Sequence, residues 1–374
     1  MSEDIKKGLL GIVVDETTIS QVMPDINSLT YRGYAVQDLC KKCIFEEVAY
    51  LVLNGDLPNK TQLNKFKKQL EKNRNITINL REIIKHMPKK SHPMDVARTA
   101  VSVMGLEDKE TNNNSPEANM RKAIRIFAKT PTAIAAFFRA RKGKNVIPPK
   151  KKLTFSENFF YMCFGKIPRK EIVKAFDVSL ILYAEHSFNV STFTARTITS
   201  SLSDIHGAIT GAIASLKGPL HGGANEEVMQ MLKKIKKPEN AKKWILNALD
   251  KKKLIMGFGH RVYTKGDSRV PTMRKYYYKV AELLNEKKLP KISQIIENVM
   301  VEKKNIHPNV DYPTGPAYHL MGFDTDFFTP IFVMSRITGW SAHIMEQHTA
   351  NKLIRPLSKY SGEKHRKVML LNQR

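Results

Sequence analysis

The spacing of hydrophobic and polar residues predicts a mainly helical chain. From residue 44 onward, apolar residues recur with the 3.6-residue period of an amphipathic helix, as in FEEVAYLVL (45–53) and KTQLNKFKKQLEKN (60–73). The sequence Ser91-His92-Pro93 begins another helix, with the proline at a favourable first position. Further helices are predicted over residues 118–129, 131–142, 154–164, 169–185, 191–204, 205–216, 224–236, 238–250, 269–288, 290–304 and 327–348.

Strand patterns are confined to the N-terminal part of the chain. Residues 8–20 are rich in β-branched side chains with rough alternation, which predicts one or two short strands. Residues 24–32 are predicted to form a turn-rich connection. No internal period indicates a repeat array. The predicted fold class is therefore all-α, mainly helical with short N-terminal β-strands.

Two predicted helical segments are apolar on most sides. They are residues 169–185 and 207–216, and the second is rich in glycine and alanine. Small residues allow close approach between backbones, so both segments are expected to be buried, in a large core or in a subunit interface. We favour a dimer interface.

Composition indicates a globular protein with a large core. The chain has 374 residues, of which 42% are hydrophobic and 26% charged, a size that favours two domains. The beginning of the sequence lacks an apolar signal region, and no apolar run approaches the roughly 20 residues that span a bilayer. We therefore expect a cytoplasmic protein with no membrane partner.

The three cysteines do not form a disulfide framework. Cys40 and Cys43 make a C-x-x-C motif, which is found in redox pairs and in halves of metal sites. No second C-x-x-C completes four ligands. Buried or partly buried helix thiols are the favoured interpretation.

The net charge of +27 raises the possibility of a nucleic-acid partner. The lysines, however, are spread along the chain without aromatic residues between them and without a recognition-helix pattern. They occur in residues 66–72, 149–152, 233–237, 251–253 and 364–367. A general lysine-rich composition is the favoured explanation, and no nucleic acid is expected as a partner. The field would still steer small anions toward the protein.

Residues 254–269, LIMGFGHRVYTKGDSR, combine glycines with a histidine and two arginines. An imidazole at His260 and guanidinium groups at Arg261 and Arg269 suit a small dicarboxylic acid with a carbonyl to polarise. The alternative is a glycine turn with solvated cations.

Two histidines lie at other predicted helix ends. His186 and Asn189 follow an apolar helix in AEHSFNVS (184–191). His221 lies between Gly-Pro and Gly-Gly, just before a helix beginning near Ala224. The positive end of that helix dipole would lower the pKa of His221 and favour a neutral imidazole, able to stabilise an enolate oxygen.

Asp311 lies in a proline- and glycine-rich stretch, residues 307–323, which is predicted to be a loop. A carboxylate there is a candidate general base, although a structural role is the alternative. Arg336 on the last long helix and Arg355 in the tail are candidate anion-binding residues, and an interior ion pair is the alternative for Arg336. HIMEQH (343–348) lacks the H-E-x-x-H spacing and a third ligand, so no metal site is predicted.

Together these stretches resemble the citrate synthase family over nearly the whole chain. The segments that carry the resemblance are YRGY (31–34), FEEVAYLVLNGDLP (45–58), HPMDVARTAVS (92–102), GPLHGGANEEV (218–228), MGFGHRVY (256–263), HPNVDYPTG (307–315) and SRITGW (335–340). The resemblance implies a mostly helical homodimer with its active site between two domains. Residues 1–222 and 323–374 would form the large domain, and residues 223–322 a small domain closing over the site.

The resemblance also implies roles for individual residues. Asp311 matches the base that removes a proton from the α-carbon of an acyl-CoA, His221 the residue that stabilises the enol, and His260 the group that polarises the ketone of oxaloacetate. The implied oxaloacetate-binding residues are His186, Asn189, Arg269, Arg336 and, reaching into the partner subunit's site, Arg355. The implied coenzyme A contacts are Leu254, Ile255, Met256, Gly257, Phe258, Gly259, Lys303, Lys304 and Arg139.

The sequence of a few segments bears on which of two acyl-CoA substrates the resemblance implies. In GDSRVPTM (266–273), Ser268 replaces a proline common in citrate synthases, and with HIMEQ and the C-terminal tail it is more similar to bacterial 2-methylcitrate synthases. Propionyl-CoA is therefore the favoured substrate, acetyl-CoA the alternative, and use of both remains open. The coenzyme A thioester is a substrate, and no permanently bound cofactor is expected. The rivals are a basic nucleic-acid-binding helical protein and a family member that has lost catalysis.

Overall fold

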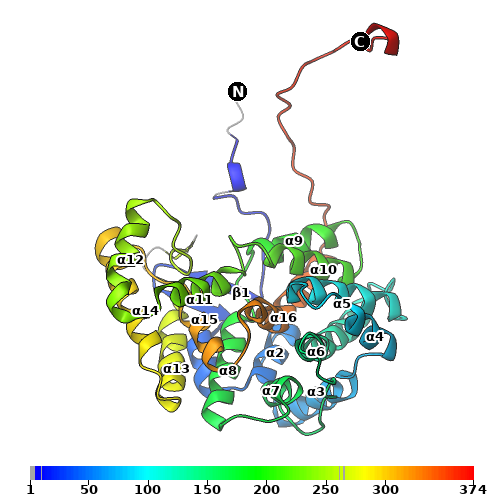
Figure 1. Ribbon diagram of the computed structural model, residues 1–374. Coiled ribbons are helices and arrows are strands. Elements are labelled where there is room, and N and C mark those ends of the chain that lie inside the picture. The colour runs from blue at the N-terminus through cyan, green and yellow to red at the C-terminus, as the bar shows by residue number, and fades with distance from the viewer. Residues whose placement is uncertain (1–4, 10, 261, 264–265) are drawn as a thin grey trace.

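The computed structural model describes residues 5–9, 11–260, 262–263 and 266–374, and these are mainly helical (Figure 1). The α-helices are α1 (Val36–Lys42), α2 (Phe45–Asn54), α3 (Lys60–Asn73), α4 (Ile78–His86), α5 (Pro93–Glu107), α6 (Pro116–Ala140), α7 (Phe155–Phe164), α8 (Lys170–Tyr183), α9 (Val190–Ser200), α10 (Ile205–Leu216), α11 (Ala224–Ile235), α12 (Pro238–Asp250), α13 (Val270–Leu283), α14 (Lys288–Lys304), α15 (Asp311–Leu320) and α16 (Phe328–Thr349). Single 3-10 turns occur at η1 (Lys7–Leu9), η2 (Thr325–Phe327) and η3 (Leu371–Gln373). The predicted fold class is confirmed.

The short sheet lies later in the chain than predicted. β1 (Ser20–Met23), β2 (Ser28–Tyr31) and β3 (Tyr34–Ala35) form an antiparallel sheet in that order. The prediction of strands within residues 8–20 is therefore wrong, apart from the first residue of β1. Val13 is 88% exposed, so the β-branched run lacks a surface to pack against. The predicted connection at residues 24–32 instead holds a turn and β2, whose Leu29 and Tyr31 are buried.

One long helix, α6, replaces the two helices predicted over residues 118–129 and 131–142. Pro131 lies inside it and is buried. A proline interrupts one backbone hydrogen bond of a helix, which is why the sequence predicts a break here. The buried surroundings of this stretch keep the helix continuous.

Three helices were not predicted: α1, α4 and α15. Thr77 caps α4 by accepting a hydrogen bond from the Leu80 N–H, a signal that the sequence does contain. The loop predicted for residues 307–323 is wrong, because α15 begins at Asp311. Its prolines suggested a loop, but Pro313 lies in the first turn, where backbone N–H groups have no helical acceptor. Asp311 therefore begins a helix.

The core is built around α8 and α16, which lie in the middle of the molecule (Figure 1). Every residue of α8 from Ala175 to Tyr183 is buried, and so is almost all of α16 up to Ile344. Most apolar residues of α10 are buried as well. The predicted burial of residues 169–185 and 207–216 is confirmed, whereas the dimer interface remains a prediction.

Helices α11 to α15 pack on one another at one side of the molecule (Figure 1). Gly315 of α15 allows a close approach, since a Cβ there would lie 2.6 Å from the carbonyl oxygen of Asn225 in α11. This group contacts the rest of the chain through α8 and α16. Its limits resemble those of the predicted small domain, and the division into two domains remains a prediction.

The described N-terminal residues before β1 and the C-terminal tail project from the same side of the helical body (Figure 1). The C-terminal segment leaves α16 beside α9, where the Ile354 N–H donates to Ser200 Oγ at 3.0 Å. Residues 355–374 are exposed. Among the described residues, no helix combines the length and apolar character required to span a bilayer.

Candidate active site

Polar side chains from four parts of the chain meet at the C-terminal end of α8. Arg336 Nε donates to the carbonyl oxygen of Tyr183 at 2.7 Å, and Arg269 Nη1 lies 3.5 Å from that of Leu182. The last turn of α8 contains no basic residue of its own. The final carbonyl groups of a helix lack helical donors and carry partial negative charge, so they hold cations supplied by other segments.

Arg269 is anchored by a buried carboxylate. Its Nε and Nη2 donate to the two oxygens of Asp267 at 2.9 and 2.7 Å. Asp267 also accepts the Val310 N–H at 3.0 Å, which ties this segment to the residue preceding Asp311. The Asp267 carboxylate raises the pKa of Arg269, whereas burial opposes this rise. Arg269 is therefore a fixed cation with one nitrogen, Nη1, directed at the helix end.

Arg336 is a buried cation without such a partner. None of the described carboxylates lies within ion-pair distance of its guanidinium, and Nη1 is buried without a hydrogen-bond acceptor. The group lies 4.7 Å above the ring of Phe332. Burial lowers the pKa of Arg336 to about 10, while the negative charge of Glu185 opposes this change. An unpaired buried guanidinium is suited to receive an anionic ligand.

His186 and His260 contribute two imidazole rings to the cluster of polar side chains at the end of α8, with ring centroids 5.0 Å apart. Burial and the charge of Arg269 lower the pKa of His260 to about 4 and that of His186 well below its usual range. The N–H groups of Val262 and Tyr263 donate to His260 Nδ1 at 3.0 and 3.2 Å. His260 is therefore neutral, with its hydrogen on Nε2. His186 Nε2 is buried without a partner among the described residues.

His221 is a second neutral donor. Its Nε2 accepts the Ser191 N–H at 3.2 Å and lies 2.8 Å from Ser191 Oγ, so the hydrogen resides on Nδ1. Burial, followed by the charge of Arg336, lowers the pKa of His221 to about 3. The predicted low pKa is confirmed, but its causes differ from the predicted one. The helix end bonded to the ring belongs to α9, not to α11, which does begin at Ala224 as predicted.

Asp311 begins α15 and faces the end of α8. The Tyr183 hydroxyl donates to its Oδ1 at 2.6 Å. Burial raises the pKa of Asp311 to about 6, against the opposing effects of the Tyr183 hydrogen bond and the Arg269 charge. No described residue donates a hydrogen bond to Oδ2. A carboxylate with a pKa near neutrality and one free oxygen has the properties of a general base.

Two site segments are tied together by backbone hydrogen bonds. The Gly259 N–H donates to the His307 carbonyl at 2.8 Å, and the Asn309 N–H to the Gly257 carbonyl at 2.9 Å. Gly257 has φ +82°, and a Cβ there would lie 2.4 Å from Val228 Cγ2. The residues before His260 and those before Asp311 therefore form one unit, which fixes the spacing of the two side chains.

The residues predicted to contact coenzyme A are only partly brought together. Leu254 is 71% exposed beside the end of α12, and Lys303 and Lys304 end the neighbouring helix α14. Arg139 lies instead near the end of α6, where it donates to the carbonyl groups of Asn145 and Cys163. The structure does not bring Arg139 to the lysines, so the combined group of three phosphate-binding cations is unsupported.

Asn189 caps α9. Its Oδ1 accepts the Thr192 N–H at 3.1 Å and the Ser191 hydroxyl at 2.8 Å, and its amide nitrogen donates to Thr192 Oγ1. These bonds occupy the side chain within the protein. The bonds place Asn189 as the helix cap that holds Ser191, the residue bonded to His221, and a ligand role for Asn189 stays a prediction.

Asn189→Ala is expected to lower the free energy of unfolding by about 1 kcal/mol, the usual cost of a lost N-cap. The KM for oxaloacetate, the ligand that the resemblance implies, should remain nearly unchanged. Urea unfolding and steady-state kinetics measure the two quantities, with Asn189→Ser as a control that keeps a capping oxygen. A large rise in KM without a loss of stability would favour the ligand role instead.

Other predicted features lie outside the cluster. Arg355 is exposed in the tail, and Arg261 lies outside the described residues. Cys40 and Cys43 are buried, as predicted, and Cys163 is buried as well. His343 is buried against Glu185 at 2.9 Å, and Glu346 pairs with Arg196 at 2.8 Å. Among the described residues, no group of three possible ligands is arranged for a metal ion.

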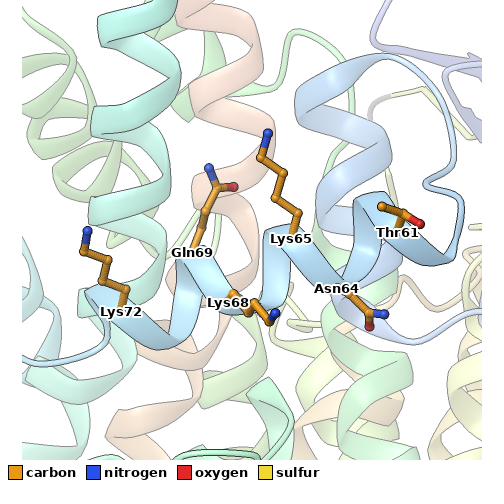
Figure 2. Close-up of a pocket in the computed structure, with 6 residues that line it drawn as sticks. All are labelled: Thr61, Asn64, Lys65, Lys68, Gln69 and Lys72. Atoms are coloured by element: carbon orange, nitrogen blue, oxygen red, sulfur yellow. The ribbon is translucent and has the colours of Figure 1, made fainter.

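A separate hollow of about 450 Å³ runs along the exposed face of α3 (Figure 2). It is lined by Thr61, Asn64, Lys65, Lys68, Gln69 and Lys72. All six residues come from one helix, none is aromatic, and Figure 2 shows the side chains spreading away from one another. It shares no residue with the cluster at α8.

Sequence reasoning missed two members of the cluster, Tyr183 and Asp267. Tyr183 ends an apolar helix, and its hydroxyl is the only feature that distinguishes it from a core residue. Asp267 is two positions from Arg269, a spacing that allows a local ion pair, and this signal was present in the sequence.

Comparison with known proteins assigns the family. The sequence matches the family described as "Citrate synthase, C-terminal domain" over residues 8–357. It is 52% identical to the 2-methylcitrate synthase of Mycobacterium tuberculosis, covering 97% of this chain and 92% of that protein. It is 51% identical to the citrate synthase of Mycolicibacterium smegmatis, covering 98% and 97%.

A solved structure gives the same result. The citrate synthase of Thermoplasma acidophilum, in a ternary complex with carboxymethyl coenzyme A and oxaloacetate, superposes with a TM-score of 0.95 at 31% identity, covering 100% of both chains. The cluster of neutral imidazoles, arginines and a carboxylate thus lies in a fold shared with a citrate synthase whose structure holds a coenzyme A derivative and oxaloacetate. The chain belongs to the citrate synthase family of condensing enzymes.

Proposed function

We propose that this protein condenses propionyl-CoA with oxaloacetate and water to give 2-methylcitrate and free coenzyme A, with acetyl-CoA and citrate as the alternative pair. The observation that carries the condensation is the combination of a buried carboxylate with a raised pKa, Asp311, with neutral imidazole donors and two buried arginines at one helix end. The rivals identified from sequence, a nucleic-acid binder and an inactive scaffold, give no reason for that combination.

In the first step, Asp311 Oδ2 takes a proton from the α-carbon of the acyl group. The C–H electron pair forms a carbon–carbon double bond, and the carbonyl π electrons move onto the thioester oxygen. His221 Nδ1–H donates to that oxygen, which stabilises the enolate without the transfer of a full proton. The lowered pKa of His221 keeps the ring neutral, and a neutral imidazole N–H is a much weaker acid than an imidazolium, so it can donate a hydrogen bond to the enolate oxygen without giving up its proton.

In the second step, the α-carbon of the enolate attacks the ketone carbon of oxaloacetate. His260 Nε2–H polarises the ketone oxygen and supplies the proton to the new alkoxide. Arg269, Arg336 and His186 hold the two carboxylates, and the unpaired atoms Arg336 Nη1 and His186 Nε2 support this assignment. Water then hydrolyses the thioester bond, which releases the acid and the coenzyme A thiol.

The preference for propionyl-CoA rests on similarity rather than on a pocket dimension. The two acyl groups differ by one methylene, which is worth only about 1–3 kcal/mol of discrimination. Ser268 Oγ lies 3.0 Å from the Tyr263 hydroxyl, and the Tyr263 ring packs against His260. Ser268 thus belongs to the oxaloacetate side of the proposed site. It distinguishes a subfamily by sequence, and we do not propose that it selects the acyl group.

We further propose that two domains and a second subunit take part in forming the active site. Residues 223–322 would close over the site against residues 1–222 and 323–374, with the exposed lysines 251–253, Lys303 and Lys304 near the coenzyme A phosphates. A homodimer would allow Arg355, exposed on the projecting tail, to reach the partner subunit's site. Closure would exclude water until the carbon–carbon bond has formed.

The test is release of free thiol from the purified protein mixed with oxaloacetate and either propionyl-CoA or acetyl-CoA. We expect both to react, with a kcat/KM several-fold higher for propionyl-CoA, because one additional methylene contributes about 1–3 kcal/mol when its pocket fits it. A higher kcat/KM for acetyl-CoA would reassign the substrate. If neither acyl-CoA yields free thiol, the proposed condensation is contradicted. Salt-dependent binding to random DNA would then favour the alternative of a nucleic-acid-binding protein.

A further inference from the structure

Tyr183 contacts both the proposed base, Asp311, and Arg336, one of the arginines proposed to bind the substrate. Tyr183 is the last residue of α8, and its hydroxyl donates to Asp311 Oδ1 while its carbonyl oxygen accepts from Arg336 Nε. Its ring is buried, with a centroid 4.0 Å from that of Phe332. Packing of the ring fixes the direction of the hydroxyl, so the carboxylate of Asp311 is held at one of its two oxygens.

The Tyr183 hydroxyl remains a donor at every working pH. Burial, together with the negative charge of Asp311, raises the pKa of Tyr183 well above its usual range. The phenol therefore does not compete with Asp311 for protons. It acts as a permanent hydrogen-bond donor to the ionised form of the base.

The pKa of Asp311 also depends on the other charged groups around it. The titratable and charged groups that act on it come from α8, the segment before α13, α16 and its own helix: Tyr183, Asp267, Arg269, Arg336 and Tyr318. Burial favours the neutral acid and Asp267 adds to that effect, whereas the arginines favour the carboxylate. Among these groups, only the Tyr183 side chain donates a hydrogen bond to the carboxylate itself.

We propose that Tyr183 is a positioning residue that holds Asp311 Oδ1, leaves Oδ2 as the proton acceptor and sets the pH at which condensation begins. This role rests on the proposed condensation. In the ground state the phenol stabilises the carboxylate and keeps it ionised near neutral pH. When Oδ2 takes the α-proton, the bond to Oδ1 weakens but remains, so the acid formed stays aligned.

The test is Tyr183→Phe, which removes one oxygen and keeps the packed ring and the backbone carbonyl. Without the hydrogen bond to the charged form, the acid limb of the kcat/KM profile for the acyl-CoA should move upward by about one pH unit. The KM for oxaloacetate should change little, since Arg336 keeps its backbone acceptor. Tyr318→Phe is the matched control, because its hydroxyl pairs with Ser179 at 2.8 Å rather than with Asp311.

An acid limb that stays in place in Tyr183→Phe would overturn the proposal, whatever happens to the maximal rate. A loss of stability alone would move the melting temperature and not the limb. If the wild type releases no thiol, the condensation itself fails, and the role of Tyr183 is then judged by carbon-13 NMR titration of Asp311, assigned with Asp311→Asn. The titration midpoint should lie near pH 6 in the wild type and higher in Tyr183→Phe; equal midpoints would overturn the role.

Discussion

Asp311→Asn is expected to reduce condensation by about 10³-fold or more and, at the same time, to stabilise the folded protein at neutral pH. The loss of activity follows from the loss of the proton acceptor. The side chain keeps its shape, and an asparagine Oδ1 can still accept the Tyr183 hydroxyl. Oxaloacetate binding should remain nearly intact, because the proposed oxaloacetate contacts come from other residues.

The gain in stability follows from the raised pKa of Asp311. An aspartate in the unfolded chain has a pKa of about 3.9, whereas burial raises the folded value to about 6. Between about pH 4 and 6 the folded state therefore binds more protons than the unfolded state, and stability falls as the pH rises. Above pH 6 the full difference, about 3 kcal/mol at most, opposes folding.

Urea unfolding at several pH values measures this effect. At pH 7.5 we expect the free energy of unfolding of Asp311→Asn to exceed that of the wild type by about 1–3 kcal/mol, and the gain to shrink as the pH falls toward 4. Asp38→Asn, at an exposed carboxylate of α1, is the control and should show neither effect. A gain that is independent of pH, or activity within tenfold of the wild type, would contradict the role of Asp311.

Most helices were predictable because their signals are local. The N-capping residue and the 3.6-residue period define the start and buried face of α3 without reference to other helices. The errors came from tertiary effects. Residues 11–19 have the composition of a strand but lack a partner strand, whereas in α15 Pro313 lies in the first turn and Pro316 is accommodated inside the buried part of the helix.

The site was predictable as a set of residues but not as an arrangement. The resemblance supplied His221, His260 and Asp311, and their chemical types alone suggested a base and two donors. The tautomers depend on backbone groups, such as the Ser191 N–H bonded to His221, and no spacing rule indicates them. Tyr183 reaches a carboxylate 128 positions away in the sequence, so its role was visible only in the fold.

Arg269→Gln and Arg336→Gln should both weaken oxaloacetate binding but should differ sharply in stability. Each removes a buried guanidinium proposed to hold a substrate carboxylate, and a lost charged pair of this kind costs about 2–5 kcal/mol of binding, or more than tenfold in affinity. The two arginines differ in what they contact when no ligand is bound. Arg269 is paired with Asp267, whereas Arg336 has no carboxylate partner among the described residues.

Arg269→Gln leaves the Asp267 side chain, which is 0% exposed, without its counter-charge. Removing one partner of a buried ion pair typically costs about 3–5 kcal/mol of stability, and we expect a loss of that size here. Arg336→Gln removes instead a cation whose lowered pKa shows that burial already disfavours its charge. Its free energy of unfolding should change by about 1 kcal/mol or less, because the cost of the buried charge offsets the lost hydrogen bond to Tyr183.

Urea unfolding and calorimetric titration with oxaloacetate separate the two roles. Arg336→Lys is the control for charge without the planar fork, and it should restore only part of the affinity, since lysine cannot make the bidentate contact. Equal destabilisation by the two glutamine variants would mean that Arg336 is an interior ion-pair partner, with buried Glu185 as the candidate, since its charge acts on Arg336. A stable Arg336→Gln protein that no longer binds oxaloacetate would instead show that the fold keeps this guanidinium unpaired for its ligand.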